Sequence, residues 1–165
     1  MPDFIGIMIT WTAYGTWLPG DPRSWRKRGA GPQTPRPLLA AWCAKQMTGE
    51  VVVLRPHDRE TVEAACREHI AVRGWRMHAV QAPTNHVHVV VVANEEPETV
   101  RDQLKANCTR RLRTQTDPLV RERTWSRGGH CDVLEDEVAL LAAVEYVLHG
   151  QDKPGWQAFG PNDCR

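Results

Sequence analysis

The apolar residues of this chain recur at two spacings: every second residue in some segments, and every third or fourth residue in others. β-Branched and aromatic residues dominate 4–14, "FIGIMITWTAY", and the run stops at Gly15, which predicts a first strand. Two further strands are predicted at 75–82, "WRMHAVQA", and at 85–94, "NHVHVVVVAN". The turn residues at 83–85 favour a hairpin between them.

Three longer segments carry apolar residues at helical spacing between residues that begin and end helices. The first follows Asp58, its expected N-cap, and ends at Gly74. The second, 97–114, opens with a proline in its first turn. The third, 135–150, has acidic residues in its first turn and a glycine at its end.

The rest of the chain gives weaker signals. The segment 15–37 is rich in proline and glycine and predicts a long loop, of the kind that is often functional in compact domains. We predict a short helix at 38–47, a short strand at 50–54, and either a strand pair or an extended edge strand at 123–134.

This order of elements predicts an α+β fold. We expect a ferredoxin-like sandwich, with helices packed on a mostly antiparallel sheet of four or five strands. The length of 165 residues fits one domain, which we place at 1–151, followed by a C-terminal extension at 152–165.

Composition removes several function classes. The 21 Lys and Arg nearly balance the 20 Asp and Glu, so no overall field points to nucleic acid or membrane. The 5 cysteines are scattered without a C-x-x-C pair, which argues against a disulfide framework or a thiolate zinc site. The first residues lack signal-peptide features, and no apolar run approaches the roughly 20 residues that cross a bilayer. We therefore expect a cytoplasmic protein that does not associate with membranes.

Two imidazoles interrupt the valine-rich strand at 85–94. Strand alternation places His86 and His88 as neighbours on one face. Buried imidazoles need hydrogen-bond partners, and two side by side also make two corners of a divalent metal site. The alternative is a pair of hydrogen-bonded sheet histidines, or a solvent-facing side of the sheet.

The chain has only two tyrosines, Tyr14 and Tyr146. On a helical wheel of the last helix, Tyr146 falls opposite an apolar stripe that includes Leu141 and Leu148, and His149 follows one turn later. We therefore expect that Tyr146 is not a core residue, although a surface or subunit contact explains the same pattern. A phenol with an ordinary pKa near ~10 needs a metal or base nearby to act as a nucleophile, and the histidine pair is the candidate.

The histidine triplet, and a tyrosine within "YVLHGQ" on the last helix about sixty residues later, resemble the single-tyrosine HUH transposases of small bacterial insertion sequences and the related REP-associated tyrosine transposases. The element order over about 4–151 and "WTAYGTWLPGD" at 11–21 are also similar. The resemblance implies that His86 and His88 bind Mg²⁺ or Mn²⁺ and that Tyr146 attacks single-stranded or hairpin DNA. The products would be a covalent 5′-phosphotyrosine and a free 3′-hydroxyl, and the resemblance also implies a homodimer.

The sequence departs from this family at the third metal ligand. The family has Gln or Asn four residues after the tyrosine, where this chain has Gly150. Its neighbours Gln151 and His149 are the replacement candidates, and we favour Gln151. Should neither reach the metal, the chain would be a decayed or domesticated descendant that binds single-stranded nucleic acid.

Basic residues gather in groups near tryptophans such as Trp25 and Trp125, a pattern that suits single-stranded nucleic acid, although solvated surfaces often look the same. Two other functions remain open: a non-catalytic module that grips single-stranded DNA or RNA, and a small metal hydrolase in which Tyr146 has no role. The candidate DNA-binding residues are Arg23, Arg26, Lys27, Arg28, Arg101, Lys105, Arg110, Arg111 and Arg127.

Overall fold

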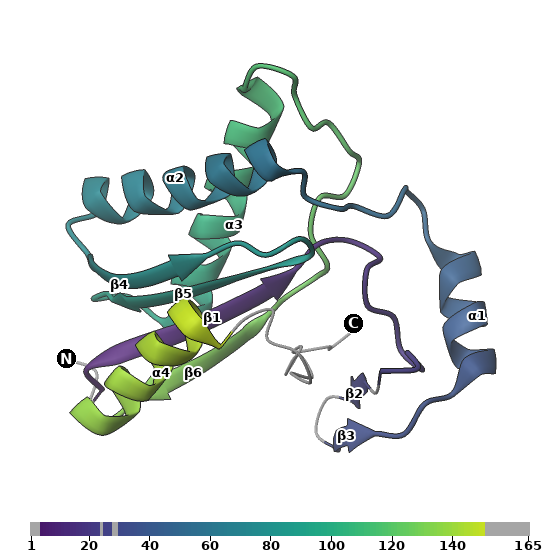
Figure 1. Ribbon diagram of the computed structural model, residues 1–165, viewed down its shortest axis with the longest axis horizontal. Coiled ribbons are helices and arrows are strands. Elements are labelled where there is room, and N and C mark those ends of the chain that lie inside the picture. The colour runs from purple at the N-terminus through teal and green to yellow at the C-terminus, as the bar shows by residue number, and fades with distance from the viewer. Residues whose placement is uncertain (1–3, 24, 28–29, 151–165) are drawn as a thin grey trace.

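A four-stranded antiparallel sheet in the order β4-β5-β1-β6 forms the centre of the computed structural model, which describes residues 4–23, 25–27 and 30–150 (Figure 1). Its strands are β1 (Gly6–Thr12), β4 (Arg76–Gln81), β5 (His86–Val92) and β6 (His130–Leu134). A separate ladder pairs β2 (Trp25–Lys27) with β3 (Gly31–Gln33). The helices are α1 (Pro37–Gln46), α2 (Pro56–Val72), α3 (Pro97–Thr114) and α4 (Glu137–His149).

Helices cover both faces of the sheet. α2 and α3 lie on one face, and α4 lies on the other (Figure 1). The order β1, α2, β4, β5, α3, β6 with this strand order is that of a ferredoxin-like βαββαβ unit, to which α4 is added. The predicted α+β sandwich is confirmed, with four strands in the main sheet.

The pleat of β1 and β5 divides the core into two parts. Ile9, Trp11 and Val89 belong to the larger cluster, which α2 and α3 cover. Val90 belongs to a smaller cluster, which is completed by residues of α4 such as Val147. Because side chains alternate along a strand, the histidines of β5 lie on the face toward α4.

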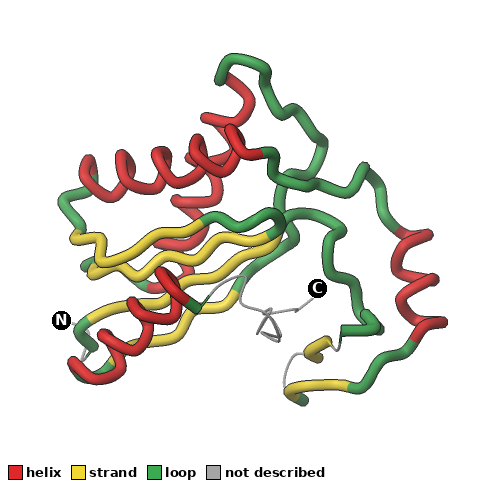
Figure 2. The backbone as a smooth tube through the Cα atoms, viewed as in Figure 1, coloured by secondary structure: helices red, strands yellow, loops and turns green. Residues whose placement is uncertain are grey.

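Most predicted helices and strands are confirmed, with bounds that differ by up to three residues. The segment 50–54 is extended but is not a strand of the sheet (Figure 2). Val52 and Leu54 are buried, and their backbone N–H groups donate to the loop residues Tyr14 and Thr84, so the alternation was real but no partner strand exists there. Asp58 does not cap α2 as the N-cap; it is the third residue of the helix, and its carboxylate accepts from the Arg55 N–H at 2.9 Å.

The segment between β1 and α2 extends away from the sheet (Figure 1). The predicted loop contains the β2–β3 ladder, and the predicted short helix is α1, which buries none of its residues and exposes Leu38 and Trp42. The expected edge strand at 123–134 is a strand only at β6, while Trp125 bridges to Ala13. Among the described residues, no helix is both long and apolar enough to cross a bilayer. The C-terminal extension at 152–165 lies outside the described residues.

Candidate active site

His86 and His88 meet on the α4 side of the sheet. Both are buried, with 8% and 1% of their surface exposed, and their ring centroids are 4.6 Å apart at an interplanar angle of 89°. β5 is central in the sheet and places both side chains under α4. The pair therefore lies in the packed interior, where polar groups need partners.

Both imidazoles are oriented through Nδ1. His86 Nδ1 lies 2.6 Å from Asn85 Oδ1, and His88 Nδ1 lies 2.8 Å from the hydroxyl of Thr10, its cross-strand neighbour on β1. A carbonyl oxygen accepts, so His86 donates from Nδ1 to Asn85. The Thr10 hydroxyl can either donate to or accept from His88 Nδ1. Metal binding through Nε2, the arrangement usual in histidine metal sites, requires the tautomer of each ring in which Nδ1 carries the proton.

Tyr146 lies against this pair. Its ring centroid is 5.7 Å from that of His88, with the two planes at 88°. The two residues belong to the same chain, so α4 brings the phenol to the histidines without a second subunit. The structure thus brings together the three residues that the sequence singled out for catalysis.

The helical wheel was right for Leu140, Val144 and Val147, which pack toward the sheet, and wrong for Tyr146 and the other leucines of the stripe. Tyr146 packs beside Ala143 and Val147 on the sheet side, whereas Leu141 and Leu148, which were expected in the core, are 61% and 45% exposed. Apolar residues surround most of this helix, so the amphipathic pattern does not determine which side is buried. The structure therefore turns Tyr146 toward the sheet.

The structure describes one of the two expected third ligands, His149. His149 has a side chain that is 61% exposed, with Nε2 3.9 Å from a carboxylate oxygen of Glu145, unlike the buried pair. Gln151 lies outside the described residues. Across residues 4–23, 25–27 and 30–150, no group of three or more His, Cys, Asp and Glu side chains could hold a metal ion.

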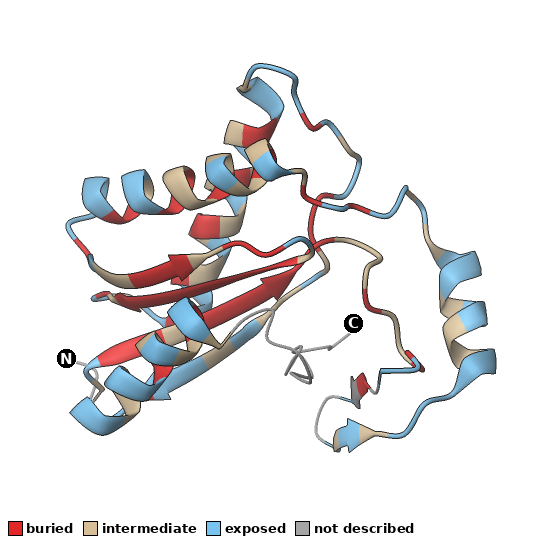
Figure 3. Cartoon of the chain, viewed as in Figure 1, coloured by how far each residue is buried: buried red, intermediate tan, exposed pale blue. Residues whose placement is uncertain are grey.

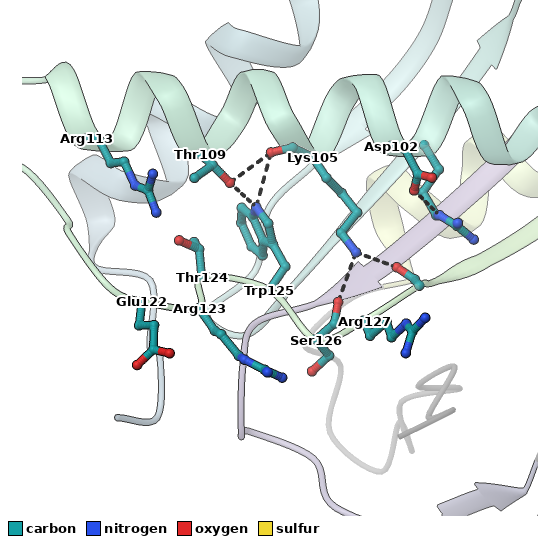
Figure 4. Close-up of a pocket in the computed structure, with 12 residues that line it drawn as sticks. Asp102, Lys105, Thr109, Arg113, Glu122, Arg123, Thr124, Trp125, Ser126 and Arg127 are labelled. Carbon is teal, nitrogen blue, oxygen red and sulfur yellow. Dashed lines mark hydrogen bonds and ion pairs between the residues drawn. The ribbon is translucent and has the colours of Figure 1, made fainter. Parts of the chain in front are cut away.

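A basic groove of about 560 Å³ runs between α3 and the segment 122–128 (Figure 4). The groove lies on the α3 side of the sheet, whereas His86 and His88 face α4 on the other side. Its edge is joined to the strand beside the histidines, because Ser126 N donates to Thr12 O at 2.9 Å and Thr12 pairs with His86. The charged residues that line the groove are Arg101, Lys105, Arg113, Arg123 and Arg127, with Asp102 and Glu122.

Lys105 is the central cation of this groove. Its Nζ donates to the carbonyl oxygens of Ser126 and Gly128 at 2.9 and 2.6 Å, which ties α3 to the loop (Figure 4). Burial, together with the charge of Arg101, lowers the pKa of Lys105 to about 8. The ammonium is therefore protonated at neutral pH and close to titration above it.

Arg23, Arg110 and Arg111 do not line the groove. Arg23 pairs with Asp21 at 2.7 Å and stacks on Trp17, 4.1 Å from the ring centroid. Arg110 bonds to Asn107 and Arg111 pairs with Glu68, so these charges are already engaged. Arg26 and Lys27 belong to β2, and Arg28 lies outside the described residues.

The tryptophans near the basic groups are not stacking platforms. Trp25 and Trp125 are only 7% and 9% exposed, and their indole N–H groups bond to Thr34 O and to Thr109. Trp25 and Trp125 therefore stabilise the fold. Trp42 on α1 is 59% exposed, but the sequence alone does not distinguish it from the buried tryptophans.

Two residues of the site were missed from sequence. Thr10 and Gln81 flank His88 on the neighbouring strands, since strand pairing places Thr10 opposite it on β1 and Gln81 opposite it on β4. Alternation predicts a face for each strand, but the identity of cross-strand neighbours depends on register, which no local pattern gives.

Comparison with known proteins gives no relative: no family model matches this chain, and neither curated proteins nor solved structures contain a match.

Proposed function

We propose that this protein is a metal-dependent enzyme that nicks and rejoins single-stranded DNA through a covalent 5′-phosphotyrosine. The observation that carries the proposal is the contact of Tyr146 with His88, 5.7 Å between ring centroids, beside a second buried imidazole. A nucleophile and a candidate metal pair in one interior site are what such a reaction requires.

The donor set suits a divalent cation. His86 and His88 would hold Mg²⁺ or Mn²⁺ through Nε2, while Asn85 and Thr10 keep the rings oriented from behind. When bound, the cation polarises the scissile phosphate as a Lewis acid.

The chain's own residues then carry out the transfer. Tyr146 Oη attacks phosphorus, so that the P–Oη bond forms as the P–O3′ bond breaks. The phenol proton passes to solvent, and the leaving 3′-oxygen takes up a proton. The phosphodiester energy is retained in the phosphotyrosine, and attack by a 3′-hydroxyl reverses the step. Arg101, Lys105 and Arg127 would hold the adjoining DNA strand in the groove.

A homodimer belongs to the same proposal. The outer side of α4 exposes Val138, Leu141 and Leu148, which form an apolar surface that a second copy could cover. Because Tyr146 already contacts His88 within one chain, the dimer would not be needed to complete the site.

The test uses hairpin DNAs labelled at the 3′ end, incubated with Mn²⁺ and the full-length protein. We expect a labelled protein adduct that survives denaturation and is lost in Tyr146→Phe. Tyr14→Phe is the matched control, because the Tyr14 hydroxyl accepts from Thr48 N at 3.1 Å and lies outside the histidine site. Cleavage without an adduct would favour a hydrolase, and an adduct lost only in Tyr14→Phe would overturn the assignment.

The groove also favours a second candidate, a non-catalytic single-strand binding protein. Five cations against two carboxylates form a site for a phosphate chain that does not depend on the histidines. This function predicts salt-sensitive binding of single strands that is unchanged in His86→Ala and by chelators, with no adduct.

A further inference from the structure

Gln81, the last residue of β4, lies beside His88 on the α4 side of the sheet. The β4–β5 register pairs Gln81 with His88 and Ala79 with Val90. Ala79 and Val90 both belong to the cluster under α4, so Gln81, two residues further along β4, shares that face. Side chains that are directly opposite in an antiparallel pair have Cβ atoms about 4.5–5.5 Å apart.

A β-bulge delivers Gln81 to this position. Met77 pairs with Val91 and packs on the α2–α3 side, but the register shifts at His78, and Ala79 then pairs with Val90. Without the extra residue, Gln81 would lie opposite Val87 and face the other side. Bulges commonly re-aim a side chain next to an active site.

The amide oxygen of Gln81 is buried, and among the described residues it accepts no hydrogen bond. A buried acceptor without a hydrogen-bond partner destabilises the folded protein. The sequence retains it next to two imidazoles, where an amide oxygen is a suitable ligand for Mg²⁺ or Mn²⁺.

The end of α4 has no room for a ligand at the position where the resembling family carries one. A Cβ on Gly150 would lie 2.5 Å from the carbonyl oxygen of Tyr146 and 2.9 Å from its ring, closer than real Cβ atoms approach. Any side chain at this position would therefore displace the end of the helix that carries the nucleophile.

We propose that Gln81 Oε1 is the third protein ligand of the cation held by His86 and His88, so that the sheet alone supplies the metal site. This inference rests on the proposed metal-dependent function. With all three ligands on β4 and β5, α4 can shift with DNA attached to Tyr146 while the cation keeps its protein ligands.

The test measures Mn²⁺ affinity by electron paramagnetic resonance on the full-length protein, without DNA. Gln81→Ala should weaken binding about tenfold or more, and Gln81→Glu, which keeps an oxygen ligand, should restore it. Gln103→Ala is the matched control, because Gln103 bonds to His69 and Glu95 on the far side of the sheet. Without metal, Gln81→Ala should melt no lower than wild type, because the truncation removes the unsatisfied oxygen.

The outcomes separate this inference from the function on which it rests. Full Mn²⁺ affinity in Gln81→Ala, with loss in His88→Ala, would overturn the Gln81 assignment and leave the metal pair standing. Loss in Gln151→Ala instead of Gln81→Ala would return the third ligand to the C-terminal side of α4. A wild-type protein that binds no Mn²⁺ would overturn both proposals.

Discussion

The two faces of β5 share one backbone and have opposite characters. Toward α2 and α3, the strand presents Val87, Val89 and Val91, each with no exposed surface. Toward α4, it presents His86 and His88, followed by Val90. β5 is buried from His86 to Val91 (Figure 3), so both of its faces are interior and differ in chemistry.

The two faces of β5 contribute differently to the stability of the fold. Burying a valine side chain contributes about 1.5–3 kcal/mol, and the face toward α2 and α3 consists of such side chains from three or more elements. Each imidazole on the other face must keep a hydrogen bond to avoid a penalty of about 1–3 kcal/mol. On the α4 side, stabilisation therefore comes from apolar residues such as Val90 and Val147, while the two imidazoles add little to folding.

Placing a histidine on the face of β5 toward α2 and α3 should have the largest effect on stability. Val89→His places an imidazole among apolar neighbours that include Ile9 and Val80, its partners across the sheet. Overpacking and an unpartnered polar group together should lower the free energy of unfolding by about 4 kcal/mol or more. Urea denaturation measures this loss.

The same substitution on an exposed strand position is the control. Val133 on β6 is 47% exposed, so Val133→His should change the free energy of unfolding by no more than about 0.5 kcal/mol. Equal effects at the two positions would mean that the face under α2 and α3 is not close-packed.

Replacing a histidine of the site by an apolar residue should lower the free energy of unfolding by less, and a second substitution should restore it. His88→Leu leaves the hydroxyl of Thr10, a residue 4% exposed, without its 2.8 Å partner, at a cost of about 1–3 kcal/mol. Adding Thr10→Val removes that hydroxyl and should restore most of the stability, while the adduct with DNA remains absent. Strictly additive losses in the double variant would show that the Thr10–His88 contact contributes no coupling energy.

The elements of the fold could be predicted because their signals are local. α3 has the predicted bounds, since a proline at its start and an apolar repeat define it from nearby residues alone. The segment 50–54 shows the limit of this reasoning. Its alternation matches its alternate burial, but strand formation needs a partner that only the tertiary fold supplies.

The sequence predicted several residues of the candidate site, but it did not predict all of them or their arrangement in space. The two histidines and Tyr146 stand out by position, and the structure brings them together. Gln81 does not stand out, because a one-residue shift at the His78 bulge decides which face it occupies. For the same reason, the partners of His88 depend on long-range register that the sequence does not display.

The smallest predicted effect concerns DNA affinity and its dependence on Lys105, which lines the basic groove on the α3 side of the sheet. Since its folded pKa is about 8, Lys105 loses its charge as pH rises from 7 to 9.5. Affinity for single-stranded DNA should fall severalfold, and the slope of log affinity against log salt should become shallower by about 0.7, the value for one lost contact to a single strand. Fluorescence anisotropy at several salt concentrations measures both quantities.

Folding should respond to pH in the opposite direction, which separates weaker binding from loss of structure. The pKa of Lys105 is lowered from its ordinary 10.5, so between about pH 8 and 10.5 the unfolded chain binds more protons than the folded one. This group therefore makes unfolding harder as pH rises, while DNA binding weakens. Lys105→Met should lose both trends, whereas Arg110→Gln, outside the groove, should keep them. A wild-type salt slope that is the same at pH 7 and 9.5 would mean that Lys105 does not contact the DNA.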